Sequence, residues 1–262
     1  MSQDAPFDRR LRRLRRDRAA ARFGEADYLH RRAADELVER LDLVTRRFGR
    51  ALDLGCAGGY LAGRLRSRGI ATATCDAGFS FAAAAGGAQG EEDRLPFADG
   101  AFDLIMSVGA LDTVNDLPGA LLLIRRALAP GGLFLAAFAG AGSLPRLRSA
   151  MLAADEAGRR GASPRIHPQI DVRAAGDLLV RAGFVSPVAD GHGLDVRFSG
   201  LPRLVADLRA MGATNLLEAR SRRPLSRLAL TAAAADFAAH AGADGKTAER
   251  IEIVSLTGWA PA

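Results

Sequence analysis

The stretch best suited to chemistry is the segment ALDLGCAGGY at residues 51–60. Its apolar run ending in Asp53 predicts a strand, and the glycines after it predict a sharp turn into a helix. Glycine has no Cβ, so the backbone can adopt positive φ and approach a ligand closely. The following helix would add free N–H groups and the positive end of its dipole. We therefore expect this turn to hold a ligand.

The glycine spacing distinguishes two candidate ligands. Dinucleotide sites have the pattern G-x-G-x-x-G, but counting from Gly55 places Ala57 and Tyr60 where the second and third glycines belong. The acid-x-G-x-G-x-G pattern of S-adenosylmethionine sites fits better, because only its middle glycine is replaced, by Ala57. S-adenosylmethionine is therefore the predicted cofactor. Its predicted contacts in this segment are Asp53, Gly55, Cys56, Ala57 and Gly59.

Polar residues near the ends of later strands extend the predicted cofactor site, because ligands of doubly wound sheets bind beyond the carboxyl ends of the strands. Asp76, about twenty residues after the turn, suits the ribose, since a carboxylate can accept both hydroxyls. A helix N-cap is its alternative role. Glu91 is the candidate acceptor for the adenine amine, with Glu92, Asp93 or a solvated acidic loop as alternatives. Ser107 either lines the floor under the methionine moiety or simply ends its strand.

No catalytic residue can be assigned from the sequence. Methyl transfer needs no covalent protein intermediate, because the sulfonium is already an activated leaving group that only has to be aligned. An O–H or N–H acceptor would need a base. His167 could serve as that base, and a loop histidine held by packing is the alternative. The other histidines show no metal-ligand spacing, so we expect no metal.

From residue 50 onward the sequence alternates between strand-like and helix-like patterns. This predicts an α/β, Rossmann-like fold with a mostly parallel, doubly wound sheet. We expect five strands up to residue 138, the third short or distorted because no β-branched residue occurs between Gly78 and Pro96. Further helices are predicted at 144–159, 172–181, 201–211 and 225–240, and further strands at 184–189, 194–198 and 252–259. The last strand is expected to lie beside the fifth.

The length of 262 residues suits one domain with an elaboration. We divide it into basic N-terminal helices at 1–48, a cofactor-binding core at 49–140, and a helical cap with closing strands of the same sheet at 141–262. No apolar run approaches the length of a membrane span and no secretory signal is visible. The two cysteines are too few for a disulfide framework. We expect a cytoplasmic protein, with peripheral association at the inner membrane as an alternative.

The N-terminal region is strongly basic, with seven arginines in the ten residues 9–18. In a helix, Leu11 and Leu14 would share one face. One interpretation is a solvated helix that packs these leucines on the core. The other is a surface that docks an acidic partner or an anionic membrane. Nucleic acid is disfavoured, because no aromatic residues are interleaved for stacking. A second helix is expected at 26–47.

Several segments together resemble class I S-adenosylmethionine-dependent methyltransferases of the biotin-synthesis type, namely LDLGCAGGY, LPFADGAFDLIMS, VNDLPGAL and LAPGGLFLAAF. The N-terminal FDRRLRRLRRDRAAARF and the C-terminal SPRIHPQIDVRAAGDLLVRAGF, DLRAMGATN and IEIVSLTGWAP are similar to bacterial relatives of respiratory complex I assembly factor 5. This resemblance implies a methyltransferase fold that hydroxylates an arginine on an iron–sulfur subunit of complex I.

The chain departs from the family pattern at three places. Ala57 replaces a glycine, Asp112-Thr113 replaces a His-Trp pair, and Gly142 replaces an acid. A left-handed conformation at Ala57 would cost about 1 to 2 kcal/mol. Three functions remain open: modification of a protein arginine, methylation of a small carboxylic acid or acyl-carrier intermediate, and a non-catalytic assembly chaperone with a degenerate cofactor pocket.

Overall fold

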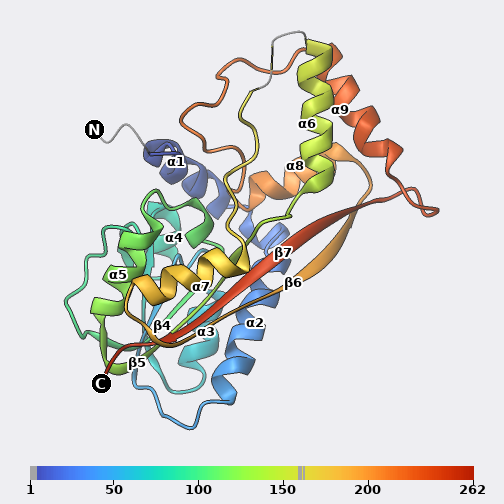
Figure 1. Cartoon of the computed structure of the whole chain (residues 1–262). Helices are drawn as coiled ribbons and strands as arrows, with labels where there is room; N and C mark the ends of the chain where they lie inside the picture. The colour runs from blue at the N-terminus through green and yellow to red at the C-terminus, as the bar shows by residue number, and fades with distance from the viewer. Residues whose placement is uncertain (1–4, 159–160, 162) are drawn as a thin grey trace.

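A computed structural model describes residues 5–158, 161 and 163–262 of the chain, so the predicted helix end at Arg159 lies outside the described residues. Its centre is a seven-stranded sheet in the order β3-β2-β1-β4-β5-β7-β6. Helices cover both faces of the sheet (Figure 1). The strands are β1 (Arg50–Leu54), β2 (Ala71–Asp76), β3 (Ala88–Gln89), β4 (Phe102–Val108), β5 (Leu128–Ala139), β6 (Val185–Phe198) and β7 (Thr247–Trp259).

The helices follow the alternation predicted for an α/β chain. They are α1 (Arg9–Ala20), α2 (Tyr28–Asp42), α3 (Tyr60–Arg66), α4 (Phe79–Ala84), α5 (Leu117–Ala127), α6 (Pro145–Gly158), α7 (Val172–Arg181), α8 (Leu201–Ala210) and α9 (Arg227–Ala239). Short 3-10 turns lie at η1 (Phe23–Glu25) and η2 (Leu111–Thr113).

Strands β1 to β5 pair in parallel, which confirms the doubly wound sheet expected from the sequence. The third strand has only two residues, as its lack of β-branched side chains predicts. The chain also runs very close to β2 just before this strand, since a Cβ at Gly87 would lie 2.1 Å from Thr74 Oγ1. Pairing is thereby limited to Cys75 with Ala88 and Asp76 with Gln89.

Two antiparallel strands complete the sheet. β7 pairs with β5 from Leu133 opposite Trp259 to Ala139 opposite Ile253, which confirms the predicted position of the last strand. The prediction of separate strands at 184–189 and 194–198 is wrong, because β6 is continuous and pairs with β7 along its length. Gly191 and Gly193 interrupt the apolar pattern in the sequence, yet both take part in this pairing. Figure 1 shows the two strands as a long ribbon that extends beyond the parallel sheet.

Three apolar clusters hold the layers together. On one face of the sheet, α5 and α7 bury Leu121, Ile124 and Leu179 against strand residues. On the other face, α2 and α3 do the same with Leu37 and Leu65. A third cluster joins α6, α8 and α9 beyond the carboxyl end of the sheet. This cap therefore overhangs the edge where ligands of such folds bind.

Candidate functional site

The turn after β1 has the predicted strand–turn–helix geometry. Gly55 has a φ of 77°, and its N–H and that of Cys56 donate to the Cys75 carbonyl at 2.8 and 3.1 Å. A Cβ at Gly55 would lie 2.3 Å from the Cβ of Ala110, so no larger residue fits. Gly59, with a φ of 74°, occupies the N-cap position of α3. The turn thus brings the ends of β1, β2 and β4 together.

Ala57 adopts the left-handed conformation whose cost was considered from the sequence. Its φ is 43°, in the left-handed region where a Cβ costs about 1 to 2 kcal/mol. The residue is buried, and its N–H donates to Asp76 Oδ2 at 3.0 Å. This hydrogen bond holds the turn against the end of β2, where Asp76 lies.

Asp53 is buried at the end of β1 and accepts a hydrogen bond from the N–H of Ala62 at 3.0 Å. Burial raises the pKa of this carboxyl to about 7. The hydrogen bond positions α3 on β1. Cys56 and Cys75 are buried free thiols, and burial raises the pKa of Cys75 to about 12.

The predicted ribose acid, Asp76, is completely buried at the end of β2. Besides the Ala57 N–H, it accepts the N–H of Gly78 on Oδ1 at 2.7 Å. The alternative role of Asp76 as a helix N-cap is wrong, because the N-cap residue of α4 is Gly78. Glu91 and Glu92, the adenine candidates, are also buried and lie beyond β3.

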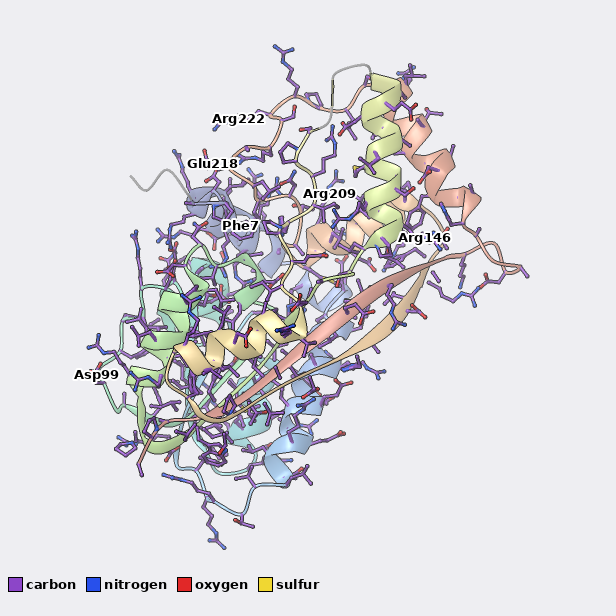
Figure 2. The ribbon with its side chains drawn as sticks, in the orientation of Figure 1. Phe7, Asp99, Arg146, Arg209, Glu218 and Arg222 are labelled. Carbon is purple, nitrogen blue, oxygen red and sulfur yellow. The ribbon has the colours of Figure 1, made fainter. Side chains whose placement is uncertain are left out.

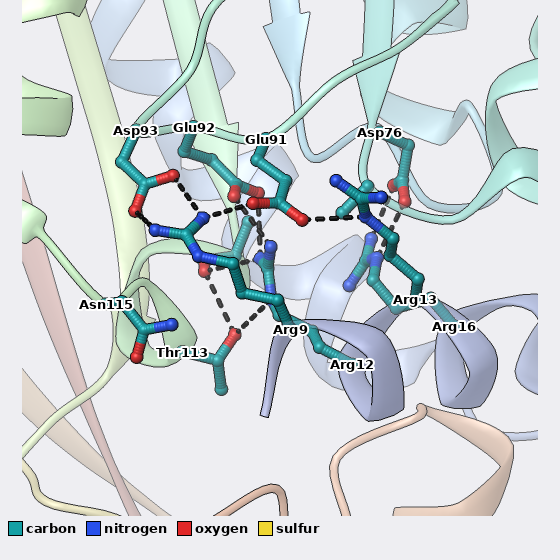
Figure 3. A network of polar contacts seen from close by, with 12 residues as sticks. Arg9, Arg12, Arg13, Arg16, Asp76, Glu91, Glu92, Asp93, Thr113 and Asn115 are labelled. Atoms are coloured by element: carbon teal, nitrogen blue, oxygen red, sulfur yellow. Dashed lines mark hydrogen bonds and ion pairs between the residues drawn. The ribbon is translucent and has the colours of Figure 1, made fainter. Parts of the chain in front are cut away.

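Helix α1 lies across these acids with one face made of arginines (Figure 3). Arg16 pairs with Asp76 through Nε at 2.7 Å and Nη2 at 2.5 Å. Arg12 pairs with Glu92 through two contacts of 2.8 Å. The remaining pairs in this face join Arg9 to Glu91 and Asp93, and Arg13 to Glu91.

The interpretation of α1 as a solvated helix that packs its leucines on the core therefore holds only for Leu11. Arg12 and Arg16 are buried, whereas Leu14 is 42% exposed and only Leu11 finds apolar neighbours. The arginines at 9, 12, 13 and 16 share a helix face because neighbours on that face are three or four residues apart. Buried carboxylates require charged or hydrogen-bonding partners, and this face supplies them.

Arg16 leaves no free acceptor position on Asp76. Burial alone would raise the pKa of this carboxyl, but the Arg16 charge and the N–H donors hold it below the ordinary value. With two bonds from Arg16 and one each from Ala57 and Gly78, the carboxylate accepts four hydrogen bonds, about all that its lone pairs allow. Any further donor must displace one of these partners.

The N-terminal end of α1 is fixed to two other parts of the chain. Phe7 exchanges two hydrogen bonds with the Asn115 side chain, at 2.8 and 3.0 Å. It also forms a β-bridge with Leu217, and Figure 2 shows it below the loop that carries Glu218. Asp8 caps the helix by accepting the Leu11 N–H at 2.9 Å. These contacts hold the arginine face over the acids.

A cavity of about 310 Å³ lies beyond the carboxyl ends of β4 and β5, on the side of α8. Most of its wall is apolar and includes Phe138, Leu208 and Ile253. A few polar side chains also line it, among them His30, Asp112, Arg165 and His167. A cavity with this composition is typical of a small-molecule or side-chain binding site.

The contacts of His167 and Ser107, two candidates from the sequence, indicate no catalytic role. His167 lines the cavity, but its Nε2 accepts the N–H of Leu216 at 2.9 Å, and burial lowers its pKa to about 4. Its ring also packs edge-on against Phe7, so the packing alternative describes it better than a base does. Ser107 is buried near the end of β4, and its Oγ lacks a partner in the described residues.

The sequence reasoning missed the roles of Arg12, Arg16, His30 and Asp112. The spacing of Arg12 and Arg16 already indicated a shared helix face, and Asp112 stood out because it departs from the family pattern. His30 lies on α2, and nothing in the sequence indicates that it approaches the distant end of β4. Its Nε2 would be 2.5 Å from a Cβ at Gly109.

Within residues 5–158, 161 and 163–262, no group of three or more histidine, cysteine or acidic side chains could hold a metal ion. Over the same residues, none of the helices has the length and apolar character needed to cross a bilayer.

The sheet order and the acid-bounded glycine turn define a class I methyltransferase fold. Residues 52–136 match a family described as a methyltransferase domain. The crystal structure of the YcgJ protein of Bacillus subtilis shares the fold, with a TM-score of 0.60 at 15% identity, covering 87% of this chain and 99% of that one.

Two relatives are similar over almost the whole chain. The mouse protein named arginine-hydroxylase NDUFAF5, mitochondrial, is 32% identical, covering 97% of this chain and 77% of the relative. The malonyl-[acyl-carrier protein] O-methyltransferase of Laribacter hongkongensis is also 32% identical, covering 94% of this chain and 87% of the relative. The chain therefore belongs to the S-adenosylmethionine-dependent methyltransferase family that includes both.

Proposed function

We propose that this chain binds S-adenosylmethionine at the carboxyl ends of β1, β2 and β4 and modifies an arginine of an iron–sulfur subunit of complex I. The observation that supports this most is the position of Asp76, buried beside the glycine turn and 3.0 Å from the Ala57 N–H. A carboxylate there can accept both ribose hydroxyls. The proposed contacts are Asp53, Gly55, Cys56, Ala57, Gly59, Asp76, Glu91 and Ser107.

Cofactor binding in this site requires α1 to move. Asp76 and Glu91, proposed for the ribose and the adenine, are both paired with arginines of that helix. The ribose hydroxyls would take the positions that Arg16 now fills on Asp76. The proposed role of α1 is thus a cover that holds the acids in the absence of cofactor and exchanges its arginines for ligand donors.

For methyl transfer, the alternative to hydroxylation, the bound cofactor would supply a methyl group on a positively charged sulfur that is already activated for transfer. The chain's own contribution is to orient the two reactants and to exclude water. The turn and Asp76 would fix the cofactor. The apolar wall of the cavity, which includes Phe138 and Leu208, would hold the acceptor next to the cofactor.

Arginine is the favoured acceptor because the arginine-hydroxylase relatives match this chain over 97% of its length. Hydroxylation is the favoured modification for the same reason, and because the cofactor's methyl group supplies no oxygen, it would need a co-substrate such as dioxygen together with a two-electron reductant. Acting on complex I would bring the protein to the inner membrane as a peripheral protein, with its arginine-rich helix available for an acidic partner once it is released. Methylation of a malonyl-carrier intermediate is the alternative that the second relative supports.

The test is mass spectrometry of complex I subunits from a deletion strain and from strains complemented with wild type or Asp76→Asn. We expect one arginine to lose the mass of an oxygen in the deletion strain and to regain it only with the wild-type gene. Loss of a methylene mass instead would assign methyl transfer to that arginine. Unchanged arginines in every subunit would contradict the proposal.

A further inference from the structure

We propose that Asp112 binds a guanidinium group of the acceptor inside the cavity beyond β4 and β5. This inference rests on the proposed function, because it concerns the acceptor half of the same site. It names the residue that would select the acceptor's charge.

Asp112 lies in η2, just after β4, and is one of the residues that line the cavity. Its Oδ1 is buried and accepts no hydrogen bond from the described residues. Burial raises the pKa of this carboxyl. Buried polar atoms in folded proteins almost always have partners, so an unpartnered carboxylate oxygen on a cavity-lining residue points to a donor supplied from outside the chain once the side chain turns toward the cavity.

A second polar atom without a partner in the described part of the chain belongs to His30, which lines the same cavity. The Nδ1 of His30 is buried and has no hydrogen-bond partner among the described residues. Burial, followed by the nearby Arg16 charge, lowers the pKa of His30 to about 4, so the ring is neutral at pH 7. A neutral imidazole offers one acceptor nitrogen. The cavity lining therefore combines a carboxyl group with a neutral imidazole, and a ligand rich in N–H donors could bond to the carboxyl group and to the acceptor nitrogen of the ring.

The cations near Asp112 are already paired with other acids. Arg12 and Arg16 approach from α1, but their guanidinium groups bind Glu92 and Asp76. Arg165 borders the cavity, and its Nε donates to Asp155 at 2.9 Å. None of these arginines forms an ion pair with Asp112. Asp112 is thus available to a cationic ligand, whose charge would favour the ionised form of the carboxyl group.

A guanidinium fits this arrangement better than a carboxylic acid does. It carries five N–H donors in a planar fork that matches a carboxylate, and its aliphatic stem can lie against apolar walls such as Phe138 and Ile253. A malonyl carboxylate would instead meet the like charge of Asp112. The cavity therefore favours the arginine acceptor over the acyl-carrier acceptor.

The inference can be tested with small probes. We would titrate the full-length protein by NMR with N-acetyl-arginine amide and with N-acetyl-citrulline amide, its neutral counterpart of the same shape. The variants are Asp112→Asn and, as a matched control, Asp99→Asn. Asp99 is exposed, and Figure 2 shows it on the far side of the core from α6 and α8. S-adenosylmethionine affinity is measured on the same samples by calorimetry.

The wild type and Asp99→Asn should bind the arginine probe about tenfold more tightly than the citrulline probe. Asp112→Asn should bind both probes equally while keeping its cofactor affinity. Equal binding of the two probes by the wild type would overturn the inference, and so would an arginine preference that survives in Asp112→Asn. Loss of cofactor affinity in Asp112→Asn would assign the residue to the cofactor instead. Failure of the wild type to bind cofactor, with the arginine preference intact, would count against the proposed function alone.

Discussion

Arg16 and Asp76 form a two-point ion pair at the end of β2, with N–O distances of 2.7 and 2.5 Å. Asp76 is fully buried, and Arg16 stacks over Phe81 with 5.2 Å from its guanidinium carbon to the ring centroid. The acid proposed to bind the ribose is therefore also the anchor of α1. A ligand that needs this acid and a helix that holds it must compete, so cofactor binding and the position of α1 are thermodynamically linked.

Arg16→Ala is expected to increase the affinity for S-adenosylmethionine about tenfold, because the ribose no longer has to displace a guanidinium. The same change should lower the free energy of unfolding by about 3 kcal/mol, since it leaves a buried carboxylate without its charge partner. Calorimetric titration and urea unfolding measure the two effects.

Arg10→Ala is the matched control, because Arg10 is an exposed residue of the same helix. It should change neither quantity appreciably. If Arg16→Ala weakens cofactor binding instead, Arg16 contributes to the cofactor site and does not compete with the ligand.

Ala57→Gly should stabilise the protein by about 1 kcal/mol, because glycine removes the strain of the left-handed conformation at the turn. Ala234→Gly, at an exposed position inside α9, should have the opposite effect and cost about 1 kcal/mol. Urea unfolding of both variants measures the contrast. A loss of stability in Ala57→Gly would show that the turn is not strained at this residue.

Asp53 should make stability depend on pH. Its folded-state pKa is raised to about 7 from an ordinary value of 3.8, so between these values the folded chain keeps a proton that the unfolded chain loses. The contribution of this group to the free energy of unfolding therefore falls as pH rises from about 4 to about 7, and it is constant above that range. Other acids, such as Asp76, have lowered pKa values and act at lower pH.

Asp53→Asn isolates this effect, because asparagine keeps an oxygen that can accept the Ala62 N–H. The stability of the wild type minus that of the variant should decrease from pH 4 to pH 8 in urea unfolding experiments. A difference that stays constant over this range would mean that the buried carboxyl titrates normally.

Much of the sheet can be predicted from the sequence, because buried parallel strands such as Phe102–Val108 are mostly apolar and lie next to turn residues. The glycine turn is predictable for a similar reason, since positive φ at Gly55 and Gly59 restricts the residue type. Strand β6 is less predictable. Its continuity comes from pairing with β7, and its glycines carry no local strand signal.

The arginine face of α1 illustrates what local patterns leave out. The spacing of its arginines is visible in the sequence, but such a face normally points to water. Its acidic partners lie between 60 and 84 residues away, so only the fold brings them together. The unpartnered atoms of His30 and Asp112 depend on the folded cavity in the same way.

Asp76 is proposed to bind the cofactor, and calorimetric titration of S-adenosylmethionine into the wild type and Asp76→Asn measures its contribution. Asp76→Asn also removes the charge partner of Arg16, which by itself should loosen α1 and ease access to the pocket. In a variant that urea unfolding shows to be folded, a fall in affinity therefore reports the lost acceptor. We predict saturable binding by the wild type and binding at least about tenfold weaker by Asp76→Asn. Equal or tighter binding by the variant, or no binding by the wild type, would contradict the claim.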